Sequence, residues 1–73
     1  IQGIADCVFQ EKNGLVIVDY KTDRVASPDE LAERYRVQLS LYGRLLSQAL
    51  GMPVTRCVIW SFHLGREVEI NFQ

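Results

Sequence analysis

Residues 13–30 read NGLVIVDYKTDRVASPDE, and this stretch holds a turn signal, a strand pattern and a helix start in direct succession. Asn13-Gly14 lies between two runs rich in branched and aromatic residues, which predicts a β-hairpin. Residues 15–21 then form its second strand, and residues 22–26 form a loop. Ser27-Pro28 with Glu30 combines an N-cap residue, a proline at the first helical position and a capping-box glutamate. A helix is therefore predicted to begin at Ser27.

The sequence on both sides extends this pattern. Residues 1–9 are strand-like, and apolar positions from Leu31 to Leu50 recur at three- and four-residue spacing, as on one face of an amphipathic helix. Gly51 followed by Pro53 ends that helix. Residues 54–62 and 67–72 alternate again, with residues 64–66 as the turn between them. The predicted fold is α/β, in the order β-β-α-β-β, with a small mixed sheet packed on one helix.

The composition restricts the class of protein. With 73 residues the chain forms one domain with a marginal core, and 48% hydrophobic and 23% charged residues are too apolar a mixture for disorder. The formal net charge of -1 argues against a free-standing nucleic-acid binder, because phosphate contacts usually leave a basic footprint. Any contact with DNA is therefore expected to be local or supplied by a neighbour.

Several remaining features predict structural roles. Cys7 and Cys57 are far apart and form no CxxC pair, so we expect buried free thiols in a reducing cytoplasm rather than a zinc or iron-sulfur site. His63 is expected to be structural or exposed, and Trp60 and Phe62 to belong to the core rather than to a base-stacking platform. No apolar run approaches the roughly 20 residues of a membrane span, and the abrupt start inside a strand pattern suggests a piece of a longer polypeptide.

The register of the predicted hairpin decides which charged residues meet. A two-residue turn at Asn13-Gly14 sets Asp6 opposite Lys21, whereas a four-residue loop sets Asp6 opposite Asp19. In both registers the three charged side chains share one face, because side chains alternate with period two. Two carboxylates and one ammonium group are therefore predicted to converge.

Such a group among apolar strands is costly unless the charges are used. A divalent cation between Asp6 and Asp19 would remove their repulsion, and oxygen ligands favour Mg²⁺ or Mn²⁺ over zinc. The metal would activate a water molecule for attack on a phosphate, while Lys21 orients that water or offsets developing charge. The alternatives are a cross-strand ion pair between Asp6 and Lys21, worth roughly 0.2 to 1 kcal/mol, or a generic two-layer domain in which D-x-K occurs by chance.

The helix adds a second candidate group. Tyr35, Gln38 and Tyr42 are spaced by three and four residues, so they project from one side of the helix. The Gln38 amide could hydrogen-bond to the catalytic carboxylates or to a DNA phosphate, and the tyrosines could stack or donate hydrogen bonds. Alternatively, the tyrosines are core residues and Gln38 is a solvated flank.

Three ordered motifs resemble a known family. The stretches GIAD at residues 3–6, VDYKTD at residues 18–23, and Tyr35-x-x-Gln38-x-x-x-Tyr42 resemble the motifs of RecB-type nucleases of the PD-(D/E)XK superfamily. The likeness spans nearly the whole chain and is strongest to the AddA-type nuclease domain of bacterial helicase-nucleases. It implies a truncated PD-(D/E)XK, restriction-endonuclease-like core, with residues 1–73 as a single partial nuclease domain of a larger protein.

The resemblance also implies roles for individual residues. Asp6 and Asp19 would be ligands of Mg²⁺ or Mn²⁺, with the backbone carbonyl of Tyr20 as a further ligand, and Lys21 would be the catalytic lysine. Gln38 and Tyr42 would form the helix motif beside the active site, with Tyr35 as its leading member. The upstream helices of the family, often with a metal-ligating histidine, are absent from these 73 residues.

The implied activity is metal-dependent exonuclease cleavage of DNA during double-strand-break repair and recombination. Its partners would be DNA and the second, AddB-like subunit of the helicase-nuclease, and ATP would bind in the helicase part, since this sequence has no P-loop. The alternative is a non-catalytic DNA- or protein-binding module that keeps the nuclease fold. Without its upstream helices, the isolated piece is expected to expose an apolar face and to self-associate.

Overall fold

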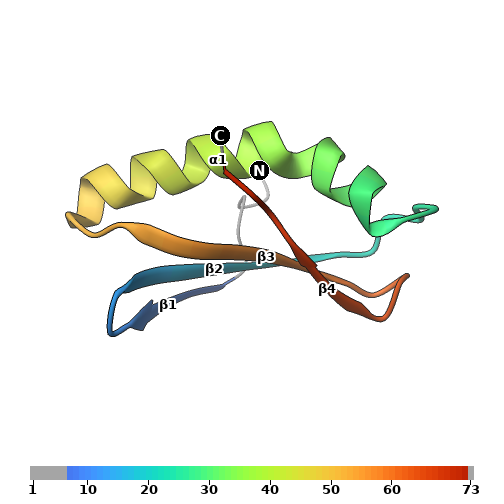
Figure 1. Ribbon diagram of the computed structural model, residues 1–73, viewed down its shortest axis with the longest axis horizontal. Coiled ribbons are helices and arrows are strands. Elements are labelled where there is room, and N and C mark those ends of the chain that lie inside the picture. Colours follow the sequence, from blue (N-terminus) through green and yellow to red (C-terminus); the bar gives the residue numbers. More distant parts are fainter. Residues whose placement is uncertain (1–6, 73) are drawn as a thin grey trace.

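A computed structural model describes residues 7–72 of the chain as four strands and one helix. The sheet order is β1-β2-β3-β4, in which β1 and β2 are antiparallel, β2 and β3 are parallel, and β3 and β4 are antiparallel (Figure 1). The α/β class, the element order and the mixed sheet are therefore confirmed. The elements are β1 (Cys7–Glu11), β2 (Gly14–Lys21), α1 (Pro28–Leu50), β3 (Val54–Ser61) and β4 (Arg66–Glu69).

The predicted helix boundaries are confirmed, and local hydrogen bonds explain them. At the start of α1, the Ser27 hydroxyl oxygen accepts a hydrogen bond from the Glu30 amide at 3.2 Å. The Glu30 carboxylate in turn accepts a hydrogen bond of 2.8 Å from the Ala26 amide. In a capping box the donor is the amide of the N-cap residue, so the contact here is shifted by one residue. At the other end, Gly51 adopts a left-handed conformation with φ 68°, and its amide donates to the Ser47 carbonyl.

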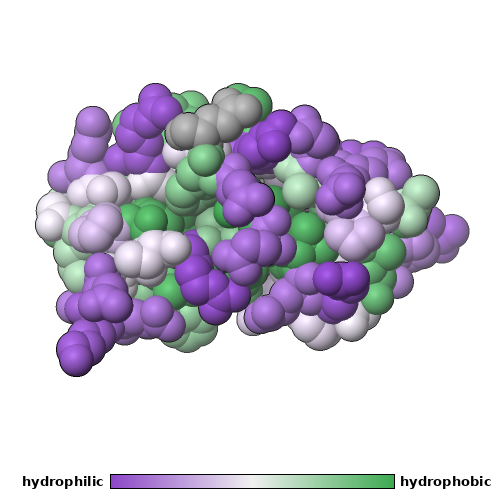
Figure 2. All heavy atoms as spheres, viewed as in Figure 1, coloured by the Kyte–Doolittle hydropathy of each residue, from purple (hydrophilic) through white to green (hydrophobic). Residues whose placement is uncertain are grey.

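The core lies between α1 and one face of the sheet. In Figure 1 the whole length of the helix lies over one face of the sheet. Figure 2 shows apolar side chains in the band between helix and sheet, with hydrophilic residues around them. Burial of these side chains holds the two layers together. The buried core residues are Ile17, Val25, Leu31, Leu39, Cys57, Ile59, Val68 and Ile70.

The hairpin register differs from that of a two-residue Asn13-Gly14 turn, which would set Lys12 opposite Leu15. Instead Gln10 pairs with Leu15, in the register of the four-residue loop. Gly14 belongs to β2, and a Cβ atom there would lie 2.4 Å from the carbonyl oxygen of Pro53. The glycine therefore allows β2 to approach the segment before β3, and the expectation that it forms the turn is wrong.

Smaller differences concern the second hairpin. Its turn covers residues 62–65 rather than 64–66, because the Ser61 hydroxyl accepts a hydrogen bond from the Leu64 amide at 3.0 Å and closes the turn early. β4 ends at Glu69, before the predicted end of the strand at residue 72. Even so, the Ile70 amide still donates to the Cys57 carbonyl at 2.8 Å, so the chain stays beside β3.

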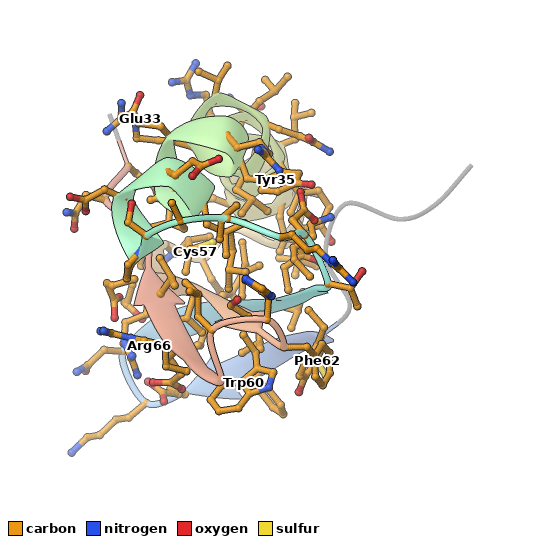
Figure 3. The ribbon with its side chains drawn as sticks, turned by 90° about the vertical axis from the view of Figure 1, so that its right-hand side faces the viewer. Glu33, Tyr35, Cys57, Trp60, Phe62 and Arg66 are labelled. Carbon is orange, nitrogen blue, oxygen red and sulfur yellow. The ribbon has the colours of Figure 1, made fainter. Side chains whose placement is uncertain are left out.

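Two apolar surfaces remain exposed on the part of the chain that the structure describes. The first, called the apolar ridge below, lies on α1 and consists of Val37, Leu41 and Leu45, which are 71%, 52% and 56% exposed. The second lies on the face of the sheet away from α1. There Phe62, 58% exposed, stacks on Tyr20 with ring centroids 6.0 Å apart, and Figure 3 shows Trp60 and Phe62 on this side.

These surfaces correct one expectation. Phe62 is not a core residue, because it follows the last residue of β3 and α1 covers only the opposite face of the sheet. Trp60 is half-buried on that uncovered side. Within residues 7–72, the structure contains no helix that is both long enough and apolar enough to cross a membrane.

Candidate active site

Asp19 and Lys21 lie near the carboxyl end of β2, on the face that α1 covers. They follow the core residue Ile17 at two-residue intervals, so the pleat of the strand turns all three to the same side. The Asp19 side chain is 2% exposed and the Lys21 side chain 19%, and 3.2 Å separates the Lys21 Nζ atom from Asp19 Oδ2. The prediction that these two residues share a face is confirmed.

The burial of Asp19 is unusual for a carboxylate. Among residues 7–72 it is the one charged residue that is buried. Removing a carboxylate from water is costly unless cations or hydrogen-bond donors compensate for the lost solvation. Lys21 supplies one such positive charge. Bulk water is kept away because Asp19 is buried on the face of the sheet that α1 covers. An arrangement of this kind is typical of a functional site rather than of a stabilising surface ion pair.

Tyr35 of α1 also contacts the Lys21 ammonium group. Its ring centroid lies 4.5 Å from Lys21 Nζ, within the range of a cation-π interaction. The Tyr35 hydroxyl donates a hydrogen bond of 2.7 Å to Asp23 Oδ2. Burial, followed by this hydrogen bond, raises the pKa of Tyr35 to about 12, so the phenol stays a donor at neutral pH. In Figure 3, Tyr35 extends from the helix on the side of the sheet opposite Trp60 and Phe62.

Asp23 lies in the loop after β2 and receives two donors on the same oxygen. Besides the Tyr35 hydroxyl, Arg34 Nη1 approaches Asp23 Oδ2 at 2.8 Å, while Arg34 Nη2 contacts Glu30 at 3.2 Å. The hydrogen bond from Tyr35, and then that from Arg34, hold the pKa of Asp23 below its ordinary value. No role for Asp23 was predicted from the sequence. The sequence feature that could have indicated such a role is the position of Asp23 two residues after Lys21.

Gln38 and Tyr42 lie farther along α1. The Gln38 side chain is exposed, and among residues 7–72 the expected side-chain hydrogen bond from Gln38 to Asp19 is not seen. Tyr42 is half-buried and packs against the core. In this structure the two residues match the alternative of a solvated flank and a core tyrosine, and their contact with DNA stays a prediction.

Oxygen donors at the site suit a hard cation. Asp19 offers a carboxylate, and Mg²⁺ is commonly held by one or two carboxylates together with water. The other predicted carboxylate, Asp6, lies outside the described residues, and no three His, Cys, Asp or Glu side chains gather among residues 7–72. The Tyr20 side chain points to the opposite face, so it would contribute its backbone carbonyl alone. The donor chemistry present therefore fits Mg²⁺ or Mn²⁺ as part of a set that Asp6 would complete.

Cys57 and His63 do not join this site as ligands. Cys57 is a free, buried thiol, and burial, reinforced by the charge of Asp19, raises its pKa to about 12. Figure 3 shows it between helix and sheet. Cys7, also free, is half-buried at the edge strand, so its expected burial is met only in part. His63 is exposed in the turn after β3, as expected.

Comparison with known proteins relates these residues to a family. The family model for the PD-(D/E)XK nuclease superfamily matches residues 1–71 of this chain. The A subunit of the ATP-dependent helicase/nuclease of Lachnoclostridium phytofermentans is 47% identical over an alignment 73 positions long, which covers 97% of this chain and 5% of that protein. The protein of the same name from Clostridium kluyveri is 47% identical over 62 residues, or 85% of this chain and 5% of that protein.

A third relative, from Thermoanaerobacter sp., carries the same name and is 44% identical over 71 residues, covering 94% of this chain and 6% of that protein. The chain thus spans 5 to 6% of the length of the curated relatives it matches. The matched region includes β2 with Asp19 and Lys21, as well as the whole of α1.

Proposed function

The chain belongs to the PD-(D/E)XK nuclease superfamily, and from that premise we propose that the end of β2 is a site of metal-dependent hydrolysis of DNA phosphodiester bonds. One observation carries the proposal. A carboxylate that is 2% exposed, that of Asp19, lies 3.2 Å from the ammonium group of Lys21 on the same strand. The pair is the D-x-K motif of the sequence, placed between sheet and helix where bulk water is scarce.

Each residue has a separate part in this proposal. Asp19, Asp6 and the backbone carbonyl of Tyr20 would hold the metal ion. When bound, Mg²⁺ or Mn²⁺ supplies Lewis-acid stabilisation of phosphate charge and lowers the pKa of a bound water. Lys21 positions an ammonium donor toward the phosphate oxygens, where negative charge increases during the reaction.

Lys21 is well placed for that task. Asp19 and the ring of Tyr35 both contact its ammonium group, and these two contacts remove much of the freedom of a long, flexible side chain. An ammonium group that is already in place does not need to reorganise when charge develops, and its effect is strong where water is excluded. Gln38, exposed on α1, and Tyr42 would contact the DNA beside the site.

The names of the relatives suggest a wider setting. Each is named as the A subunit of an ATP-dependent helicase/nuclease, so we propose that this segment is the nuclease part of such a protein. Its activity would be exonucleolytic and would act in double-strand-break repair and recombination. DNA and a second, AddB-like subunit would be its partners, and ATP would bind in regions outside these 73 residues.

The test is DNA degradation by a helicase/nuclease subunit that carries this segment. Lys21→Ala should lower kcat by about 10²- to 10³-fold, the usual loss for a charge-stabilising donor, and Asp19→Ala should abolish metal-dependent cleavage. DNA-stimulated ATP hydrolysis should persist, which shows that the helicase part of each variant is intact. Glu69→Gln is the matched control, because Glu69 pairs with Arg56 at 3.0 Å on the opposite face of the sheet.

A different result would favour the non-catalytic module. If Lys21→Ala and Asp19→Ala degrade DNA at the wild-type rate, the site at the end of β2 does not perform the cleavage. If the wild-type protein cleaves no DNA in Mg²⁺ or Mn²⁺, the fold is not catalytic.

A further inference from the structure

A chain of contacts connects the loop after β2 with the ammonium group of Lys21. Arg34 and Tyr35 are neighbours on α1, and both donate to the same oxygen of Asp23, at 2.8 Å and 2.7 Å. The Tyr35 ring, anchored in this way at its hydroxyl, lies 4.5 Å from Lys21 Nζ. Lys21 in turn contacts Asp19. The order of contacts is therefore Arg34, Asp23, Tyr35, Lys21 and Asp19.

The hydroxyl anchor restricts the direction of the ring. A tyrosine side chain on a helix can turn about two bonds, and packing against the core restrains only its body. A hydrogen bond at the far end of the ring fixes the remaining freedom. The ring of Tyr35 then presents its negative face to the ammonium group, and the cation-π attraction limits the rotamers of Lys21.

Arg34 keeps Asp23 in the right place for this contact. Asp23 lies in a loop, where a side chain without partners would be mobile. Arg34 ties its carboxylate to the first turns of α1 and is itself held by Glu30. The loop that follows the catalytic strand is thereby fixed to the helix that carries Tyr35.

We propose that Asp23 is a positioning residue, which acts through Tyr35 to hold the Lys21 ammonium group in its reactive place beside Asp19. The inference rests on the proposed function, since it assigns Asp23 to the reaction at that site. Asp23 itself would touch neither the metal nor the DNA. Its effect would be on the rate of the chemical step and not on the affinity for DNA.

The competing interpretation is that Asp23 and Arg34 form a surface ion pair that merely fastens a loop. Arg34 is 43% exposed, and exposed ion pairs contribute little to stability. If Asp23 only fastens the loop, Asp23→Ala should change kcat by the same factor whether or not the Tyr35 hydroxyl is present. A positioning role predicts strong dependence, because both residues act through one hydrogen bond.

The experiment is a double-mutant cycle on the kinetics of DNA cleavage, in a helicase/nuclease subunit that carries this segment. Asp23→Ala and Tyr35→Phe should each lower kcat, by about 10- to 100-fold as is common for partners that orient a reacting group, and leave KM for DNA unchanged. The double variant should be no slower than Asp23→Ala alone. Asp23→Asn keeps an acceptor for the Tyr35 hydroxyl and should recover part of the rate.

The controls separate this proposal from the proposed function. Glu69→Gln also removes a carboxylate charge beside an arginine, but on the opposite face, and should leave kcat unchanged. Wild-type kcat in Asp23→Ala or Tyr35→Phe, with cleavage lost in Lys21→Ala, would overturn the positioning role alone. Losses that multiply in the double variant would also overturn it. Wild-type cleavage by Lys21→Ala would instead refute the proposed function. Tyr35→Phe keeps the ring and so tests the anchor even if Asp23→Ala fails to fold.

Discussion

Chemical labelling of Cys57 tests whether α1 covers the face of the sheet that carries Asp19. Cys57 lies in β3 beside Ile17 of β2, is 1% exposed, and has a pKa raised to about 12 by burial and by Asp19. The thiolate is the reactive form of cysteine. At pH 8 its fraction is about 10⁻⁴ for a pKa of about 12, against about one tenth for a thiol with the ordinary pKa of 9.0. The native thiol should therefore react about 1,000-fold more slowly before any steric protection is counted.

Global unfolding sets a limit to this protection, because unfolded molecules react at the unprotected rate. A domain of 73 residues that is stable by about 0.05 kcal/mol per residue or more has an unfolding free energy of about 3.7 kcal/mol or more, so about one molecule in 500 or fewer is open. We therefore expect iodoacetamide at pH 8 to label Cys57 of the 73-residue chain at least about 500-fold more slowly than in urea. Labelled peptides are quantified by mass spectrometry, with the half-buried Cys7 as the site that reacts earlier.

The pH dependence provides a second readout. Because the folded pKa is raised, the thiolate population of the folded state should increase about tenfold per pH unit from pH 8 to 11, whereas labelling through global unfolding should level off above the ordinary thiol pKa of 9.0. Native labelling of Cys57 within tenfold of its rate in urea would refute the reasoning. It would mean that the helix does not exclude water from the layer that contains Asp19.

Three further perturbations test other parts of the fold. Gly14→Ala should lower the free energy of unfolding in urea by more than about 1 kcal/mol, because its Cβ would lie 2.4 Å from the Pro53 carbonyl oxygen; an unchanged midpoint would contradict the close approach. Asp23 has a lowered pKa in the folded state, so its contribution to stability is complete above its ordinary value of 3.8 and is lost as the pH falls through the lowered one. The difference in unfolding free energy between the wild type and Asp23→Asn should therefore shrink toward pH 2, and a difference that grows in acid would contradict this sign. The exposed apolar ridge should make the 73-residue chain self-associate, and Leu41→Glu should reverse this; a wild-type monomer by light scattering at high concentration would exclude it.

The helix and the face of Asp19 were accessible from sequence because both depend on local rules. Ser27 and Gly51 delimit α1 through hydrogen bonds to residues within four positions. Asp19 and Lys21 share a face because the strand pleat has a period of two. Neither conclusion requires knowledge of the tertiary contacts.

The hairpin register and the support of Lys21 were not accessible, because both depend on contacts between distant segments. Gly14 was taken for a turn residue, although its lack of a side chain serves a contact with Pro53 across the sheet. Asp23 and Tyr35 meet only because α1 packs back onto β2 after a loop. The motif pattern contains both residues, but spacing along the chain does not show which side chain reaches which.

The central claim is that Asp19 holds a catalytic metal ion, and calorimetric titration with Mg²⁺ and Mn²⁺ tests it most directly. The titration is performed without nucleotide on a helicase/nuclease subunit that carries this segment. We predict binding to the wild type and to Glu69→Gln, and loss of that binding in Asp19→Ala. Equal binding by Asp19→Ala and the wild type, or no binding by the wild type, would contradict the claim.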